Sequence, residues 1–199
     1  MILRVSSVLV ALAFAAFIAG CSESPTAQYD ASKTAIEEAR LAGAEMYAPD
    51  LLKEAADSLN AATVEIQKQD GRFSVLRDYD KAEEIIVIAQ QLAGRANQEA
   101  VAEKERVRLA DSTLIVEIET LISETKGIIA TAPRGKGSRV DLKVMQADLD
   151  GASGALTAAT EEFQKGDYLS ARNSLSAVKS QVVKVKSEIE AAVARLTKK

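Results

Sequence analysis

The chain has no histidine and no tryptophan, and it contains a single cysteine, Cys21. Without histidine, the chain cannot assemble a zinc site of Cys and His ligands, a Cys/His nucleophile pair or a Ser/His/Asp triad. A single cysteine also excludes an internal disulfide. We therefore expect no catalysis, no metal and no cofactor.

Large aromatic side chains are also scarce, and acidic residues outnumber basic ones. The 199 residues include four Phe and four Tyr, whereas Ala, Glu, Lys, Leu and Val dominate, which is typical of long helices and coiled coils with thin cores. Without Arg4, the only charged residue among the first twenty, 24 basic residues face 29 acidic ones, a net charge of −5. This mild acidity argues against nucleic acid as a partner.

Residues 1–20 have the pattern of a signal peptide. Arg4 supplies the positive charge, and the apolar run from Val5 to Ile18 is fourteen residues long, too short for a bilayer core that needs about 20. The sequence that follows, Ile18-Ala19-Gly20-Cys21, resembles the lipobox of bacterial lipoproteins. The resemblance implies that Cys21 becomes the lipidated N-terminus, with diacylglycerol on sulfur and a third chain such as palmitate on the amine. Two or three acyl chains make a stable anchor. The alternative is a plain signal peptide or membrane anchor with an incidental cysteine.

The residues after Cys21 predict where the anchor is placed and how it is joined to the fold. In Gram-negative lipoproteins an Asp after the cysteine favours the inner membrane, and here Ser22 stands there. We therefore expect the outer membrane, with the protein facing the periplasm. Residues 21–29 are expected to form a polar tether that includes Pro25.

Apolar spacing predicts helices from residue 30 onward. One helix is expected over Asp30–Ala48, a second from Pro49 to Asp70, and a third from the N-cap Asp78 to Thr131, with a break near Arg108–Asp111 as an alternative. The first stripe comprises Ala35, Ala39, Ala42 and Met46, and the second comprises Leu52, Ala55, Leu59, Ala62 and Ile66.

The last third of the chain has the most regular coiled-coil pattern. After a turn at Ala132–Ser138, apolar residues alternate at spacings of three and four on both sides of Gly166-Asp167. This spacing predicts an antiparallel helical hairpin. Its stripes are Leu142, Met145, Leu149, Ala152, Leu156, Ala159 and Phe163, then Tyr168, Ala171, Leu175, Val178, Val182, Val185, Ile189, Ala192 and Leu196.

An internal repeat indicates duplication. Residues 59–68 match residues 156–165 at seven of ten positions, and both copies continue to Asp-Tyr-x-x-Ala, with eight extra residues in the first copy. We therefore predict an all-α protein of antiparallel helical hairpins in an elongated bundle, formed by two duplicated three-helix units at 30–108 and 109–199. The alternative is that helical composition alone produced the similarity.

A family resemblance also indicates a location in the bacterial envelope. The segments Ala39-Arg-Leu-Ala-Gly-Ala44 and Tyr47-Ala-Pro resemble an alanine-rich helical domain of unknown function in small bacterial envelope lipoproteins. The resemblance covers about residues 31–103 and the lipobox. It implies an envelope location and a helical fold, and no activity.

Few residues are candidates for direct contacts. Tyr47, Tyr79 and Tyr168 lie at predicted helix ends, where they could form a partner-facing surface. The C-terminal Lys199 resembles the peptidoglycan-linked lysine of the major outer-membrane lipoprotein, although terminal lysines also suit the helix dipole. The glycine-rich segment Arg134–Ser138 could hold an anionic head group, but it suits a helix connector better.

These observations favour a structural or adaptor lipoprotein. Its helical faces would bind another envelope protein or a second copy of the chain, and the lipid anchor would hold it at the membrane. The alternative is a carrier of lipids or small molecules in an opened bundle, which extra apolar positions would line. These positions are Ile86, Val87, Val183 and Val193.

Overall fold

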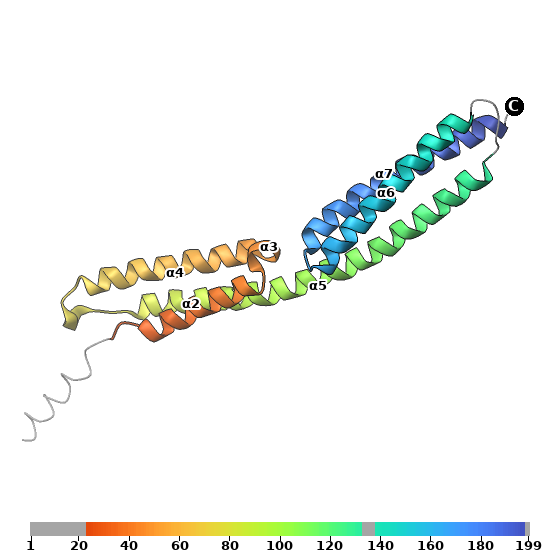
Figure 1. The fold of residues 1–199 in the computed structure, drawn as a ribbon. Coiled ribbons are helices and arrows are strands. Elements are labelled where there is room, and N and C mark those ends of the chain that lie inside the picture. Colours follow the sequence, from red (N-terminus) through yellow and green to blue (C-terminus); the bar gives the residue numbers. More distant parts are fainter. Residues whose placement is uncertain (1–22, 133–137, 198–199) are drawn as a thin grey trace, which may run out of the picture. The chain divides into compact units, whose positions relative to one another are not determined.

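The computed structural model describes residues 23–132 and 138–197. All regular structure in this part of the chain is helical, which confirms the all-α prediction (Figure 1). The predicted leader, Cys21, Lys199 and most of the turn before Ser138 lie outside the described residues. The helices are α2 (Thr26–Leu41), α3 (Ala44–Tyr47), α4 (Pro49–Asp70), α5 (Asp80–Thr131), α6 (Ser138–Gln164) and α7 (Tyr168–Thr197), with a 3₁₀ turn at Ser74–Leu76.

The chain divides into two compact units after Glu103, a few residues before the boundary predicted at Arg108. The helix α5 contributes its first part to the first unit and its remainder to the second. It continues without interruption through Arg108–Asp111, so the break considered there is absent. Its start is set by Asp78, whose Oδ1 accepts the backbone N–H of Asp80 at 3.0 Å.

The tether is shorter than predicted, because α2 already begins at Thr26, directly after Pro25. The prediction that residues up to Tyr29 precede the fold was therefore wrong. Tyr29 is held on α4, where its hydroxyl lies 3.1 Å from Thr63 Oγ1. Tyr29 and Thr63 are 34 positions apart, so the local spacing of apolar residues could not indicate this contact.

The helix predicted over Asp30–Ala48 is interrupted at Gly43. This glycine has φ of 93°, a left-handed conformation that favours glycine, and it separates α2 from α3. The interruption also changes which face is buried, so the predicted stripe through Met46 was wrong: Met46 is 61% exposed. The buried residues are Ser32, Ile36, Ala39, Ala44, Tyr47 and Ala48.

The helices α4 and α5 complete the first unit. The predicted α4 stripe is buried from Leu52 to Ala62, but Ile66 is only half-buried and the neighbouring Glu65 is buried in its place. The side of α5 that packs in this unit is built mainly from alanine, which allows helices to approach closely. Tyr79, which directly precedes the helix, is buried. The buried residues of the helix in this unit are Ala82, Ile86, Ala89, Ala93, Ala96 and Ala100.

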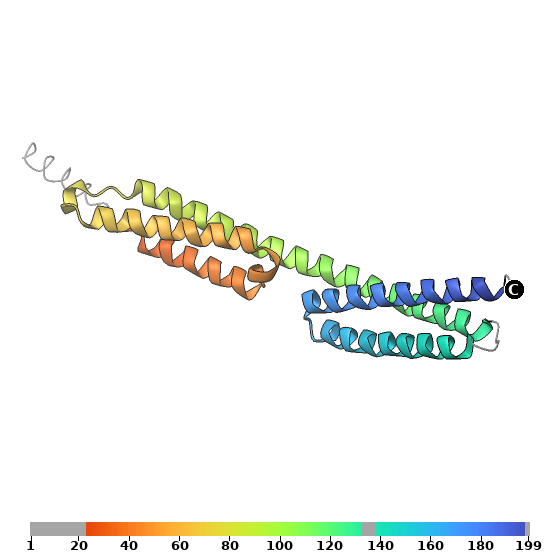
Figure 2. The ribbon, with the colours of Figure 1, turned by 90° about the horizontal axis from the view of Figure 1, so that it is seen from above.

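The second unit is formed by the rest of α5 together with α6 and α7. Figure 2 shows α6 and α7 side by side, running in opposite directions, as the spacing predicts. Gly166, with φ of 84°, makes the reversal between them. The core comprises Ile118, Ile122, Leu149, Ala152, Leu156, Ala159, Leu175, Val178, Val182, Val185 and Ile189.

The two units bury corresponding positions of the repeat. The α4 residues Leu52, Ala55, Leu59 and Ala62 match Leu149, Ala152, Leu156 and Ala159 of α6 at an offset of 97, and all of them are buried. The buried α5 residues from Ala82 to Ala100 match buried α7 residues from Ala171 to Ile189 at an offset of 89. Duplication stays a prediction, and this shared burial is consistent with it.

Candidate functional site

The three tyrosines predicted as a partner surface do not form one. Tyr47 is 8% and Tyr79 is 1% exposed, while Tyr168 is half-buried. The Tyr47 ring lies beside Gly43, and the Tyr168 ring contacts Phe163 with centroids 5.3 Å apart. Two of the rings are therefore interior residues of the first unit, and the third belongs to the α6–α7 turn.

A polar cluster closes the end of the first unit where α4 meets α5. The carboxylate of Glu65, which is 8% exposed, accepts hydrogen bonds from Gln69 Nε2 at 2.9 Å and from Lys68 Nζ at 3.1 Å. Lys81 Nζ approaches it from α5 at 3.7 Å. The hydrogen bonds from Gln69 and Lys68 hold the pKa of Glu65 below its ordinary value of 4.5.

The same cluster fixes the connection from α4 to α5. Gln69 Oε1 accepts the backbone N–H of Asp78 at 3.2 Å, and the Tyr79 hydroxyl donates to Asp70 Oδ1 at 2.5 Å. The bond to Asp70, together with burial, raises the pKa of Tyr79 above its ordinary value of 10.0. Arg77 adds hydrogen bonds to the backbone carbonyls of Asp70 at 3.0 Å and Arg72 at 3.2 Å. Both ends of the connection are thus held to the helices.

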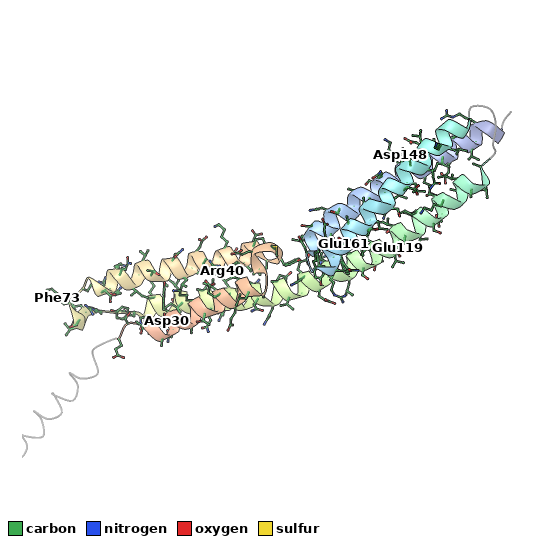
Figure 3. All side chains as sticks on the ribbon, in the orientation of Figure 1. Asp30, Arg40, Phe73, Glu119, Asp148 and Glu161 are labelled. Carbon is green, nitrogen blue, oxygen red and sulfur yellow. The ribbon has the colours of Figure 1, made fainter. Side chains whose placement is uncertain are left out.

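The centre of this connection exposes apolar side chains. Phe73, Val75 and Leu76 are 82%, 69% and 64% exposed. Figure 3 shows Phe73 at the end of the first unit. We call residues 71–77 the apical loop. Three large apolar side chains within four residues form a patch that solvent alone does not explain.

The apical loop lies at the end of the first unit where α2 begins. Figures 1 and 2 both show the start of α2 at the same end as the loop. Gln28 of α2 lines a shallow hollow together with Asp78 and Lys81, which follow the loop in sequence. The described chain therefore enters the fold next to its most exposed apolar segment.

The second unit contains a buried ion pair that sequence reasoning missed. Arg172 Nε of α7 donates to Asp111 Oδ1 of α5 at 2.8 Å, and Arg172 Nη2 donates to the carbonyl of Val107 at 3.2 Å. The Asp111 side chain is fully buried, whereas that of Arg172 is 37% exposed. Only the departure of Asp111 from the apolar pattern could have indicated this pair, because the residues are 61 positions apart.

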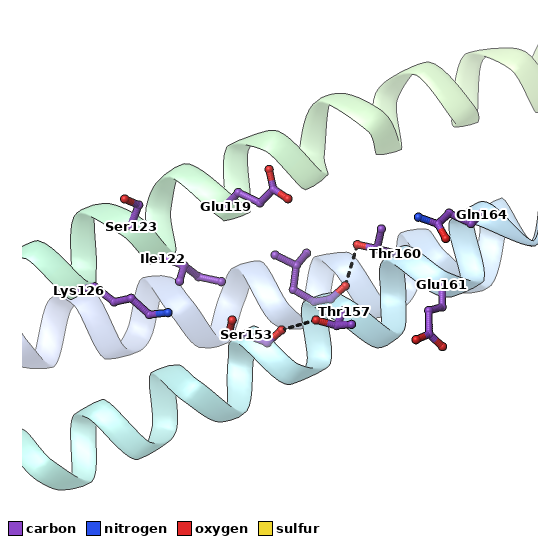
Figure 4. A pocket seen from close by; sticks show the side chains of 10 residues that line it. Glu119, Ile122, Ser123, Lys126, Ser153, Thr157, Thr160, Glu161 and Gln164 are labelled. Carbon is purple, nitrogen blue, oxygen red and sulfur yellow. Dashed lines mark hydrogen bonds between the residues drawn. The ribbon is translucent and has the colours of Figure 1, made fainter.

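A shallow groove runs between α5 and α6 in the second unit (Figure 4). Ile122 and Leu156 are its buried apolar residues, and most of its other lining residues are polar. The Thr157 and Thr160 hydroxyls are bonded to backbone carbonyls of their own helix, at 3.2 and 2.8 Å. The groove is therefore a polar surface feature and offers no enclosed apolar site.

The apolar positions invoked for a carrier do not line one cavity. Ile86 is buried in the first unit, and Val87 on the same helix is 46% exposed. In the second unit Val193 packs against the core, whereas Val183 is 47% exposed. Among the described residues, no hollow brings these four side chains together.

Among residues 23–132 and 138–197, no group of three or more Cys, Asp or Glu residues is arranged to hold a metal ion. None of the helices in the described part of the chain has an apolar stretch long enough to cross a membrane.

Comparisons of the chain with protein-family models, with curated proteins and with solved structures found no match. The resemblance to a helical domain of envelope lipoproteins therefore stays a prediction from residues 39–44 and 47–49.

Proposed function

We propose that the protein is a lipid-anchored structural or adaptor lipoprotein of the bacterial envelope, attached through Cys21 to the outer membrane and facing the periplasm. The observation that carries this proposal is the position of the lone cysteine directly after the signal-peptide pattern. Long helices with exposed side chains also suit binding, because a partner helix can pack along such a face.

The short tether determines which end of the fold the anchor would hold near the membrane. Only four residues separate Cys21 from the first residue of α2, Thr26. Fully extended, the five residue steps between them span at most about 17 Å. A lipid on Cys21 would therefore hold the α2 end of the first unit close to the head groups of the membrane.

Partner binding would use the exposed faces of the helices. In the second unit these faces carry solvated ion pairs and isolated apolar side chains, including Val116, Val144 and Val183, which are 59%, 56% and 47% exposed. We propose that such positions contact another envelope protein or a second copy of the chain.

Labelling in cells tests the anchor. Cells that produce the protein are grown with radiolabelled palmitate, and the intact mass of the purified protein is measured. We expect label and acyl mass in the natural chain and neither in Cys21→Ser. Fractionation of inner and outer membranes then tests the location. A natural chain without label would contradict the anchor.

Photocrosslinking tests the adaptor role. A photoreactive residue replaces Val116, Val144 or Val183, and the exposed polar position Asp150 serves as the control. We expect a discrete crosslinked species from at least one apolar position and none from the control. Equal diffuse crosslinking at all positions would contradict a specific face.

Attachment of Lys199 to peptidoglycan is a separate part of the proposal. Lysozyme digestion of isolated sacculi should release a muropeptide-tagged form if the bond exists, and deletion of Lys198 and Lys199 together should abolish that form, because deletion of Lys199 alone leaves another terminal lysine. Complete extraction of the protein from the sacculi by detergent would contradict the attachment.

A further inference from the structure

We propose that the apical loop inserts into the membrane surface, with Phe73, Val75 and Leu76 among the upper acyl chains and Arg72 at anionic head groups. The loop would be a second membrane contact beside the lipid, and it would set the orientation of the first unit. The location of the loop at a membrane rests on the proposed function, whereas its capacity to enter a bilayer does not.

The loop is longer than the reversal of the chain requires. The corresponding reversal in the second unit, between α6 and α7, uses only residues 165–167. The first unit uses residues 71–79 between α4 and α5. The additional residues include Phe73, Val75 and Leu76, which are all exposed and therefore contribute little to packing. Some other role must account for these apolar side chains.

The loop is held in a defined conformation. Ser74–Leu76 forms a 3₁₀ turn, and Arg77 is bonded to the backbone carbonyls of Asp70 and Arg72. Gln69 holds the backbone of Asp78 on the other side. A preordered apolar loop loses little conformational entropy when it enters a bilayer, which favours insertion.

The position and charge of the apical loop favour a membrane as its partner. Gln28 lies next to Asp78 at this end of the first unit, and Cys21 precedes Gln28 by seven residues. The proposed anchor would therefore bring a bilayer to the loop before any other partner. Arg72 and Arg77 flank the apolar residues; Arg77 holds the backbone of the connection, whereas the Arg72 guanidinium can pair with lipid phosphates. Apolar residues flanked by arginine are suited to the boundary between head groups and acyl chains.

The absence of tryptophan from the chain allows a direct test. Phe73→Trp places a single indole in the loop of the full processed protein, which is reconstituted into vesicles of phosphatidylcholine and phosphatidylglycerol. Leu41→Trp is the matched control, because Leu41 is 88% exposed at the other end of α2. We expect a blue-shifted emission and quenching by lipids brominated on their acyl chains at position 73. At position 41 we expect quenching by aqueous acrylamide instead.

Two further variants test the chemistry of the loop. In protein that carries no acyl chains, so that the lipid does not dominate the affinity, Phe73→Ser combined with Leu76→Ser should weaken binding to added vesicles by about tenfold or more. Arg72→Gln should weaken binding to vesicles that contain phosphatidylglycerol but not to phosphatidylcholine alone. Circular dichroism should show unchanged helix content in both variants. Binding that is unchanged in both would overturn the proposal.

The anchor and the insertion fail in different ways. The intact mass reports the acyl chains, whereas the indole at position 73 reports the loop. An acylated protein whose indole stays open to acrylamide would overturn insertion and leave the anchor standing. A protein without acyl chains can still be titrated with vesicles, and a blue shift at position 73 would then support insertion by itself. A blue shift that follows protein concentration without lipid would overturn the proposal in favour of pairing between copies.

Discussion

Replacing Arg172 by Met should destabilise the second unit strongly, because it leaves the carboxylate of Asp111 buried without its cation. Met keeps much of the length and packing of the arginine stem while it removes the charge. Asp111 Oδ1 would lose its bond from Arg172, and Oδ2 has no hydrogen-bond partner in the described part of the chain.

The expected cost follows from burial. Removing one partner of a buried ion pair costs about 3 to 5 kcal/mol. Because the Arg172 side chain is 37% exposed, water can reach part of the site, and we expect the lower end, about 3 kcal/mol. For a unit that covers residues 104–199, this cost corresponds to a fall in Tm of more than about 10 °C.

The same two helices provide a matched control. Lys179 of α7 pairs with Glu117 of α5 at 2.7 Å, but their side chains are 39% and 49% exposed. Lys179→Met should therefore cost less than about 1 kcal/mol. The comparison separates burial from the mere presence of an ion pair between α5 and α7.

Urea unfolding is the measurement. Phe163→Trp, in the Phe163–Tyr168 ring contact, adds a fluorescence reporter for the second unit, and circular dichroism follows total helix. Asp111→Asn removes the buried charge as well, so the double variant with Arg172→Met should cost less than the two single changes together, by about 2 kcal/mol. Equal losses for Arg172→Met and Lys179→Met, or strict additivity in the cycle, would refute the reasoning.

Three other predictions concern the first unit. Gly43→Ala should destabilise it by about 1 to 2 kcal/mol in thermal melts, because φ is 93° and a Cβ would lie 3.3 Å from the Tyr47 ring. Gly94→Ala, at a helical position where a Cβ has open space, should stabilise the unit by up to about 1 kcal/mol in the same melts. Ser32→Ala should raise the stability by about 1 kcal/mol in urea unfolding, since the buried hydroxyl has no hydrogen-bond partner; a loss would reveal a missed bond. The lowered pKa of Glu65 contributes stability that is fully present above pH 4.5 and is lost as the pH falls through the pKa of the folded state. Glu65→Gln should therefore flatten the acid side of a profile of melting temperature against pH. An unchanged profile would exclude this carboxylate as the source of the acid-side loss.

Helical class and most buried stripes could be predicted from local pattern. Spacings of three and four place Leu149 and Leu156 on one face of a helix whatever it packs against, and both are buried. Pro49 and Gly166 mark a start and a reversal through their own backbone preferences. The identity of Cys21 as a lipidation site also comes from local pattern alone, and it stays a prediction.

Other features depend on residues that are distant in sequence. Gly43 lies in an alanine-rich stretch that suits one continuous helix, yet the chain bends there and buries Tyr47 instead of Met46. Glu65 is buried in place of Ile66, with its charge bonded by Lys68 and Gln69 and approached by Lys81. For Glu65, Lys81 of α5 is a partner that lies outside the local window.

The composition and spacing of this chain thus determine that it forms helices and at which residues most of the helices end and the chain reverses. They also determine which leucines and alanines face inward. These properties depend on neighbours within one or two helical turns. The pairing of Asp111 with Arg172 and the position of the apical loop beside the start of α2 were decided only when the helices packed. The physical reason is that burial of a charge and exposure of an apolar loop depend on which elements meet, and that information is spread over the whole chain.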